Sequence, residues 1–148
     1  MTPREAVAAV LDPELPSLTI EDLGILRGVV EVGDRVVVTI TPTYTGCPAL
    51  QEISDDIRAA LPGRDVEVRT VLAPAWTSDW ISAAGREKLA AGGIAPPRRG
   101  VVPVTLTVRC PQCGSGDTEQ LSRFGSTACK ELWRCSACRE PFDHFRDH

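Results

Sequence analysis

Hydrophobic residues in the N-terminal half of the chain follow two spacings. Helical spacing over residues 3–11 and 48–60 predicts two amphipathic helices. Alternation predicts strands at residues 26–32 and 35–42, joined by the tight turn Gly33-Asp34, and a third strand around residues 66–71. The expected order is helix, hairpin, helix, strand, which makes residues 1–73 a small α+β domain.

The pattern changes after this domain. Residues 74–103 contain Trp76 and Trp80, a short helix expected at residues 85–91, and then a stretch rich in glycine and proline that predicts a linker. Alternating residues 104–109 predict a strand leading into the last part of the chain. We therefore divide the chain into residues 1–73, a tryptophan-containing helical segment with its linker at 74–103, and a third region at 104–148.

The third region carries two Cys-x2-Cys pairs. Two intervening residues allow one tight turn to direct both thiolates at a single metal ion, and two such turns complete a tetrahedral site. The expected fold is a β zinc ribbon. Two disulfides, a rubredoxin-like iron site, and extra ligation by His144 or His148 from an exposed tail are the alternatives. The four expected zinc ligands are Cys110, Cys113, Cys135 and Cys138.

Composition and charge restrict the partners and the compartment. The net charge is −4, and residues 104–148 carry as many acidic as basic side chains, so neither nucleic acid nor an anionic membrane is an expected partner. The sequence shows no apolar run long enough to span a bilayer and no secretory signal pattern. We expect a cytoplasmic protein, where paired cysteines are more often metal ligands than disulfides.

Two cysteines remain outside the ribbon pairs. Cys47 precedes an expected helix N-terminus, where the helix dipole favours a thiolate, and Thr45 and Gly46 allow close approach. Cys129 lies beside Lys130, which favours the same ionised form. Each is a candidate iron–sulphur ligand or transfer thiol, and each is equally compatible with a small buried side chain.

Asp12 and Glu14 flank Pro13 near the N-terminus. They fit either an acid/base pair or, more simply, turn and capping chemistry. Trp76 and Trp80 fit either a cover over the sheet or a partner surface. Because the sequence contains no recognisable catalytic constellation, we expect no catalytic residues and no enzyme activity.

Several motifs together resemble a known family. Asp12-Pro13-Glu14, the segment 22–25 and the run from Thr41 to Pro48 resemble the small domain of iron–sulphur assembly factors. Together with the tryptophan segment 76–80, the segment 93–97 and the cysteine-rich tail, the chain resembles the D subunits of bacterial phenylacetyl-CoA epoxidases.

This resemblance implies an accessory protein of phenylacetate catabolism that assists iron–sulphur cluster assembly or insertion in the reductase component. It implies that Cys47 transfers the cluster and that Asp12, Glu14, Thr45 and Gly46 belong to the family motif. The expected cofactors are Zn²⁺ and a transient iron–sulphur cluster, and the expected partners are the reductase or other epoxidase subunits, with homo-oligomerisation left open.

Three alternatives are kept. The first is a non-catalytic structural subunit of the oxygenase complex. The second, a nucleic-acid-binding zinc ribbon, is disfavoured by charge, and the third, a thiol oxidoreductase, by the lack of a thioredoxin-like strand–helix context for either cysteine pair.

Overall fold

A computed structural model describes residues 1–44, 48–98 and 108–147. The chain divides into two compact units, residues 1–85 (unit 1) and residues 86–148 (unit 2), and the division falls inside helix α3 (Ala83–Ala91). Each unit is described by itself below.

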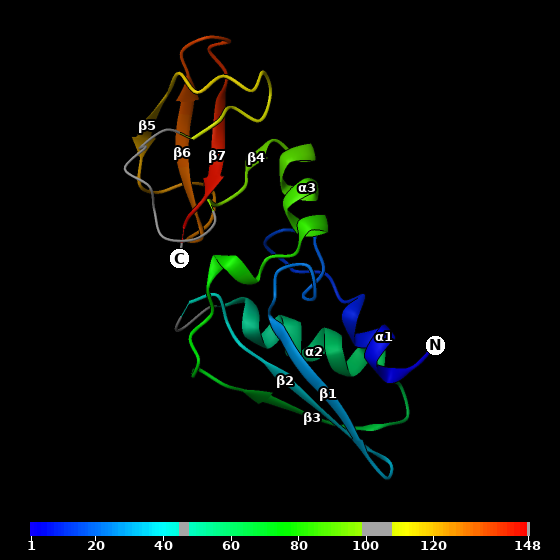
Figure 1. The fold of residues 1–148 in the computed structure, drawn as a ribbon. Helices are drawn as coiled ribbons and strands as arrows, with labels where there is room; N and C mark the ends of the chain where they lie inside the picture. Colours follow the sequence, from blue (N-terminus) through cyan, green and yellow to red (C-terminus); the bar gives the residue numbers. More distant parts are fainter. Residues whose placement is uncertain (45–47, 99–107, 148) are drawn as a thin grey trace. The chain divides into compact units, whose positions relative to one another are not determined.

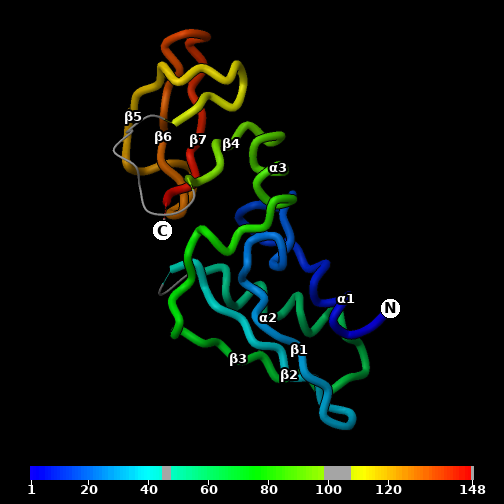
Figure 2. The backbone as a smooth tube through the Cα atoms, in the orientation of Figure 1, coloured from blue at the N-terminus to red at the C-terminus, as the bar shows by residue number. Residues whose placement is uncertain are grey.

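Unit 1 is built on a three-stranded sheet in the order β1-β2-β3 (Figure 1). β1 (Leu26–Val32) and β2 (Arg35–Ile40) form the antiparallel hairpin that the sequence predicts, and Gly33 in its turn has a positive φ of 60°. β3 (Asp65–Thr70) runs parallel to β2, with Arg35 opposite Asp65 and Ile40 opposite Thr70. A parallel neighbour requires a crossover, and helix α2 (Ala49–Ala60) provides it, as the backbone path in Figure 2 shows.

The core of unit 1 lies between this sheet and two helices. Val36, Val38 and Ile40 of β2 are fully buried, and so are Ile53 and Ile57 of α2. Helix α1 (Pro3–Ala8) contacts β1 and α2, and α2 also contacts β3. Burying each large aliphatic side chain contributes about 1.5–3 kcal/mol, so this apolar layer supplies much of the stability of unit 1.

The first helix is shorter than the sequence predicts. Its start is as expected: Thr2 caps it, and Thr2 and Glu5 exchange hydrogen bonds in a capping box. It ends at Ala8 rather than at residue 11, however, and Leu11 forms an isolated antiparallel bridge with Thr19. The Asp12 amide donates to the Leu18 carbonyl, so the chain after Ala9 has exchanged helical bonds for longer-range ones.

The tryptophan segment packs on unit 1 after β3. Trp76 is buried, and its indole N–H donates to the Leu23 carbonyl at 2.8 Å. A short 3₁₀ helix (Ser78–Trp80) follows, in which the Trp80 ring lies 3.9 Å from the guanidinium of Arg27. Both rings therefore contact the chain around β1.

Unit 2 contains a four-stranded sheet in the order β4-β7-β6-β5 (Figure 1). β5 (Thr118–Ser122), β6 (Lys130–Cys135) and β7 (Pro141–Phe145) are antiparallel neighbours, and β4 (Ile94–Ala95) adds to β7 in parallel. The core around it consists of Ala95, Val108, Cys110, Trp133, Cys135 and Phe142.

Part of the stretch expected to be a linker is tied into this sheet. Ile94 pairs with Asp143 and Ala95 with His144, and the Arg98 side chain donates to Asp147. The strand expected at residues 104–109 falls largely outside the described residues, and Val108 and Arg109, which are described, are not in a strand.

His144 was expected in an exposed tail, and this expectation is wrong. It is a β7 residue with 1% of its surface exposed, and its ring contacts Trp133 and Glu131 of β6. Within the described part of the chain, the helices are all too short or too polar to span a membrane.

Candidate metal centre and candidate thiol site

The four cysteines of the two Cys-x2-Cys pairs converge on one point in unit 2. Their sulphur atoms all lie within 4.8 Å of one another. The Sγ atoms of Cys110 and Cys138 are 3.7 Å apart, and those of Cys113 and Cys135 are 3.6 Å apart. Four thiolates about 2.3 Å from a central zinc in a tetrahedron are separated by roughly 3.8 Å, so the arrangement fits a tetrahedral metal ion.

The same distances disfavour the alternative of two disulfides. A disulfide holds its sulphur atoms about 2.05 Å apart, and the four thiols here are free. The donor set consists of four soft sulphur ligands with no carboxylate or water position, which is the chemistry of a closed structural site. A metal ion bound there would hold the two turns together.

Two tight turns position these ligands. In the first turn, the Gly114 amide donates to the Cys110 carbonyl at 2.9 Å. The second turn lies between β6 and β7. Amide groups also point at the sulphur atoms: Gln112 N–H donates to Cys110 Sγ at 3.4 Å, and Cys138 N–H donates to Cys135 Sγ at 3.5 Å.

These contacts make the thiols unequal. The Cys138 amide stabilises the Cys135 thiolate and lowers the pKa of Cys135 to about 7. The Glu140 amide acts in the same direction on Cys138, but burial and the neighbouring thiol of Cys135 outweigh it and raise the pKa of Cys138 to about 12. A metal ion must therefore displace at least one tightly held proton to bind all four sulphurs.

Neither Cys129 nor His144 joins this group. Cys129 is buried just before β6, with its sulphur 2.9 Å from the Thr127 hydroxyl. The Nδ1 atom of His144 lies 2.6 Å from Glu131 Oε1. The cluster role suggested for Cys129 remains a prediction.

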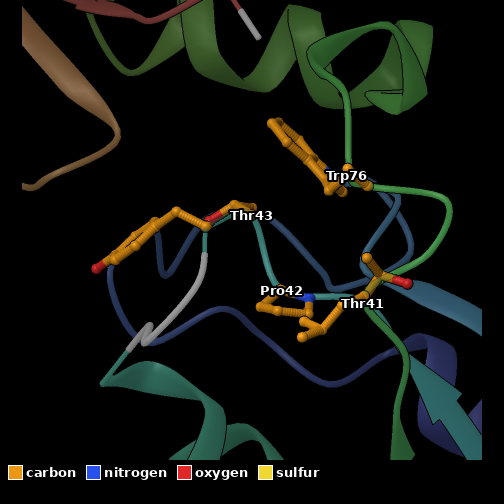
Figure 3. Close-up of a pocket in the computed structure, with 7 residues that line it drawn as sticks. Thr41, Pro42, Thr43 and Trp76 are labelled. Carbon is orange, nitrogen blue, oxygen red and sulfur yellow. The ribbon is translucent and has the colours of Figure 1, made fainter.

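The second candidate site surrounds the start of α2 in unit 1. Thr45, Gly46 and Cys47 lie outside the described residues, but the residues on both sides of them are described. Thr41, Pro42 and Thr43 follow β2 and, together with Trp76, line a cavity of about 80 Å³ (Figure 3). The Thr41 side chain is 2% exposed, and its hydroxyl has no hydrogen-bond partner within the described residues.

The acidic motif also lies near the start of α2. Asp12 is buried, and its Oδ1 accepts from the amides of Glu14 and Leu15, both at 2.9 Å. Asp12 therefore performs the turn-capping role that the sequence allows. Glu14 lines a cavity of about 210 Å³ together with Pro13, Pro48, Ala49 and Glu52, which brings the acidic motif next to the residue that follows Cys47.

The sequence patterns do not predict that Thr41 and Trp76 line the same cavity. The two residues are 35 positions apart, and neither belongs to a repeated spacing. Both, however, occur in the motifs that carry the family resemblance.

Fold and sites together define a class of protein: an α+β domain of the iron–sulphur assembly type, followed by a four-cysteine zinc ribbon. Residues 4–72 match the family model "Iron-sulfur cluster assembly protein", and residues 95–146 match "PaaD zinc beta ribbon domain". The predicted fold class is thereby confirmed. A crystal structure of a domain of unknown function DUF59 from Bacillus anthracis has the same kind of fold, with a TM-score of 0.55, 29% identity, and coverage of 59% of this chain and 87% of that one.

The particular family follows from a relative of nearly full length. The chain is 46% identical over 145 residues to the putative D subunit of 1,2-phenylacetyl-CoA epoxidase from Escherichia coli (strain K12), covering 95% of this chain and 88% of the relative. The chain therefore belongs to the family of phenylacetyl-CoA epoxidase D subunits, as its motifs predicted.

Two shorter relatives match about half of the chain. The Fe-S protein maturation auxiliary factor SufT of Staphylococcus aureus (strain USA300) is 38% identical over 79 residues, which is 49% of this chain and 88% of the relative. The Fe-S protein maturation auxiliary factor YitW of Bacillus subtilis (strain 168) is 37% identical over 82 residues, which is 52% of this chain and 79% of the relative. Both are named as auxiliary factors rather than as enzymes.

Proposed function

We propose that this protein is a cytoplasmic, non-catalytic maturation factor of the phenylacetyl-CoA epoxidase, and that it assists assembly or insertion of the iron–sulphur cluster of the reductase component. The observation that carries the proposal is the combination of two relationships in one chain. The nearly full-length relative is named as an epoxidase subunit, and about half of the chain is similar to auxiliary factors of Fe-S protein maturation. Residues 4–72 match the iron–sulphur cluster assembly family model.

Cys47 is the thiol that we propose holds or passes the cluster. In the sequence it falls between Tyr44 and Pro48. Tyr44 borders the Thr41–Trp76 cavity, and Pro48 borders the Glu14 cavity. Iron in such clusters prefers thiolate ligands, and a thiol at the start of a helix is favoured as thiolate. Thr45 and Gly46 are proposed to let the cluster approach the backbone.

Cys129 is kept as a second candidate ligand. Its side chain is 4% exposed, so a cluster would reach it only if the surrounding loop moved. Transfer is therefore assigned first to Cys47. We propose zinc, rather than iron, as the metal of the four-cysteine site, because a closed site of this kind commonly stabilises a small domain with little core of its own.

The experiment is co-expression of the reductase component with the wild-type protein, Cys47→Ser or Cys129→Ser. Iron, sulphide and visible absorbance of the purified reductase are then measured. Cys47→Ser should lower cluster content severely, while zinc content and circular dichroism of the variant stay as in the wild type. A reductase with normal cluster content beside folded Cys47→Ser would refute the transfer role.

A structural subunit of the oxygenase complex is the second candidate, and the word "subunit" in the name of the nearly full-length relative favours it. This alternative predicts stable co-purification with the oxygenase components and no effect of Cys47→Ser on the cluster. Anaerobic metal and sulphide analysis adds a further distinction. Iron and sulphide lost in Cys47→Ser support a cluster carrier, whereas zinc alone after anaerobic reconstitution supports a structural role or a docking protein.

A further inference from the structure

The four cysteines of the metal centre are not equally accessible from solvent. Cys110 and Cys135 are 2% and 0% exposed, and Cys138 is half-buried, whereas Cys113 is exposed. Cys113 is the second cysteine of the first pair, and it lies in the turn that precedes β5 rather than in a strand. A small solute therefore reaches Cys113 more readily than the other three ligands.

Cys113 also differs from the other three ligands in its hydrogen bonds. The Cys110 sulphur accepts from the amide two positions further along the chain at 3.4 Å, and the Cys135 sulphur accepts from the amide three positions along at 3.5 Å. The Cys138 sulphur accepts from the amide two positions along. Among the described residues, no N–H group donates to the Cys113 sulphur. An amide donor stabilises a thiolate and makes it a weaker nucleophile, so we expect Cys113 to be the strongest nucleophile of the four.

A second sulphur lies close enough to complete a disulfide with Cys113. The Cys135 sulphur is 3.6 Å from that of Cys113, and a disulfide requires about 2.05 Å. Cys135 is fixed at the end of β6, whereas Cys113 belongs to an exposed turn, so a shift of that turn by roughly 1.5 Å closes the gap. Accessible, reactive cysteines beside a resolving thiol are the ones that oxidants modify reversibly.

We propose that hydrogen peroxide oxidises the metal centre at Cys113, and that Cys135 converts the product to a disulfide. The Cys113 thiolate attacks one peroxide oxygen: an S–O bond forms, the O–O bond breaks and hydroxide leaves, which gives a sulphenic acid. The Cys135 thiolate then attacks the Cys113 sulphur: an S–S bond forms, the S–O bond breaks and a second hydroxide leaves. The two thiolates together lose two electrons, and one peroxide gains them.

The disulfide leaves the metal ion with two of its four protein ligands, so the ion is released. Because metal binding supplies folding free energy in a small domain, unit 2 should then lose its fold, while unit 1, which holds none of the four ligands, keeps its own. A dithiol reductant with added zinc reverses both changes. The inference rests on the proposed zinc in this site, and it does not depend on the proposed cluster transfer by Cys47.

The test is exposure of the zinc-loaded, full-length protein to graded amounts of hydrogen peroxide. A chromogenic chelator follows the released zinc, and dimedone, which reacts with sulphenic acids, is added to parallel samples. Peptide mass spectrometry then identifies the labelled cysteine and the disulfide. Metal analysis of the untreated protein comes first. A site without zinc would overturn the metal assignment and this inference together, whereas a zinc site with an unreactive Cys113 would overturn this inference alone.

Cys113→His and Cys138→His form a matched pair of variants. Each replaces the second cysteine of its pair by another zinc ligand, so each site keeps four ligands of the Cys₃His type. Cys138 is the control, because it is less exposed and its sulphur accepts an amide hydrogen bond. Peroxide-driven zinc release from Cys113→His should be roughly tenfold slower than from the wild type, whereas release from Cys138→His should stay within about twofold of it.

The expected result in the wild type is dimedone on Cys113 at substoichiometric peroxide, followed by a disulfide between Cys113 and Cys135 and release of about one zinc ion per chain. If Cys113→His fails to bind zinc, labelling of the wild-type protein decides the matter, because it needs no substitution. Zinc release with Cys113 unmodified, first labelling of another ligand, a disulfide between Cys113 and a cysteine other than Cys135, or equal slowing in both variants would overturn the proposal.

Discussion

Gly114 and Arg139 occupy equivalent positions in the two metal-binding turns. Each directly follows the second cysteine of a Cys-x2-Cys pair, and each has a left-handed backbone conformation, with φ of 76° and 65° respectively. Glycine adopts this conformation without steric cost, whereas arginine, which has a Cβ atom, adopts it only at a cost in free energy. The second turn therefore carries a local strain that the first turn avoids.

Replacing Arg139 by glycine should stabilise unit 2. Relief of the left-handed strain is worth about 1–2 kcal/mol, and the greater freedom of glycine in the unfolded chain offsets part of it. The expected net gain is about 0.5–1 kcal/mol. Denaturant unfolding of the metal-loaded protein, followed by tryptophan fluorescence, measures it.

The matched control is Gly114→Ala in the first turn. A Cβ at Gly114 would meet no atom within 4 Å, so its cost is conformational alone. It should destabilise the same unit by about 1 kcal/mol. Opposite signs for the two variants are the expected outcome, and destabilisation by Arg139→Gly would show that the arginine side chain contributes more than its backbone strain costs.

Loss of one metal ligand should release the metal and unfold unit 2 while unit 1 stays folded. Cys110→Ser removes a soft ligand from a closed site, and the metal content should fall from about one ion per chain to near zero, because metal binding supplies folding free energy in small domains. Metal analysis and amide hydrogen exchange measure the two effects separately. Rapid exchange confined to unit 2, residues 86–148, is expected.

Cys129→Ser is the control for that experiment. Cys129 is buried, but its sulphur is not in the four-cysteine group, so the variant should keep its metal and lose about 1 kcal/mol of stability at most. A Cys110→Ser protein with full metal content and a protected unit 2 would contradict the ligand assignment.

Local sequence patterns were sufficient to predict the elements for which hydrophobic periodicity and turn residues agree. The β1–β2 hairpin follows from alternation around Gly33, and α2 follows from Ile53 and Ile57 at helical spacing. Prediction failed where distant partners decide the structure. Leu11 was expected in the first helix but forms a bridge with Thr19. Ile94 was expected in a linker, because its surroundings are rich in glycine and proline, but it pairs with β7.

The same distinction applies to the sites. Two-residue spacing within each cysteine pair predicted a common site for the four cysteines, and their sulphur atoms do converge, because each pair is a local turn. The burial of His144 could not be predicted in this way, since its ring packs against Trp133 and Glu131 of β6, which are more than ten positions away in the chain. The approach of Glu14 to Pro48 depends likewise on tertiary packing.

Gly24 should tolerate no side chain. It has a φ of 73°, and a Cβ there would lie 2.6 Å from Trp80 Cβ and 2.7 Å from the Trp80 carbonyl oxygen. Gly24→Ala therefore combines left-handed strain with overpacking and should destabilise unit 1 by about 3 kcal/mol. Gly28→Ala, where a Cβ meets nothing within 4 Å, is the control. Thermal unfolding of both variants checks the difference, and equal stability would mean that the tryptophan segment does not pack closely on Gly24.

Metal affinity should fall as the pH is lowered, and most steeply below neutrality. Bound metal requires thiolates, so every thiol that is protonated before binding must release its proton, and each such thiol costs about tenfold in affinity per pH unit. Cys138, with its pKa raised to about 12, contributes over the whole range, whereas Cys135, with its pKa lowered to about 7, contributes only below that value. Because the metal stabilises unit 2, the stability of unit 2 should be retained at high pH and lost on acidification.

Competition with a chelator between about pH 6 and pH 8.5 measures the slope of metal affinity against pH. Cys129→Ser, whose altered residue is not a ligand, should give the same slope, and an affinity independent of pH would exclude a site made of four thiolates.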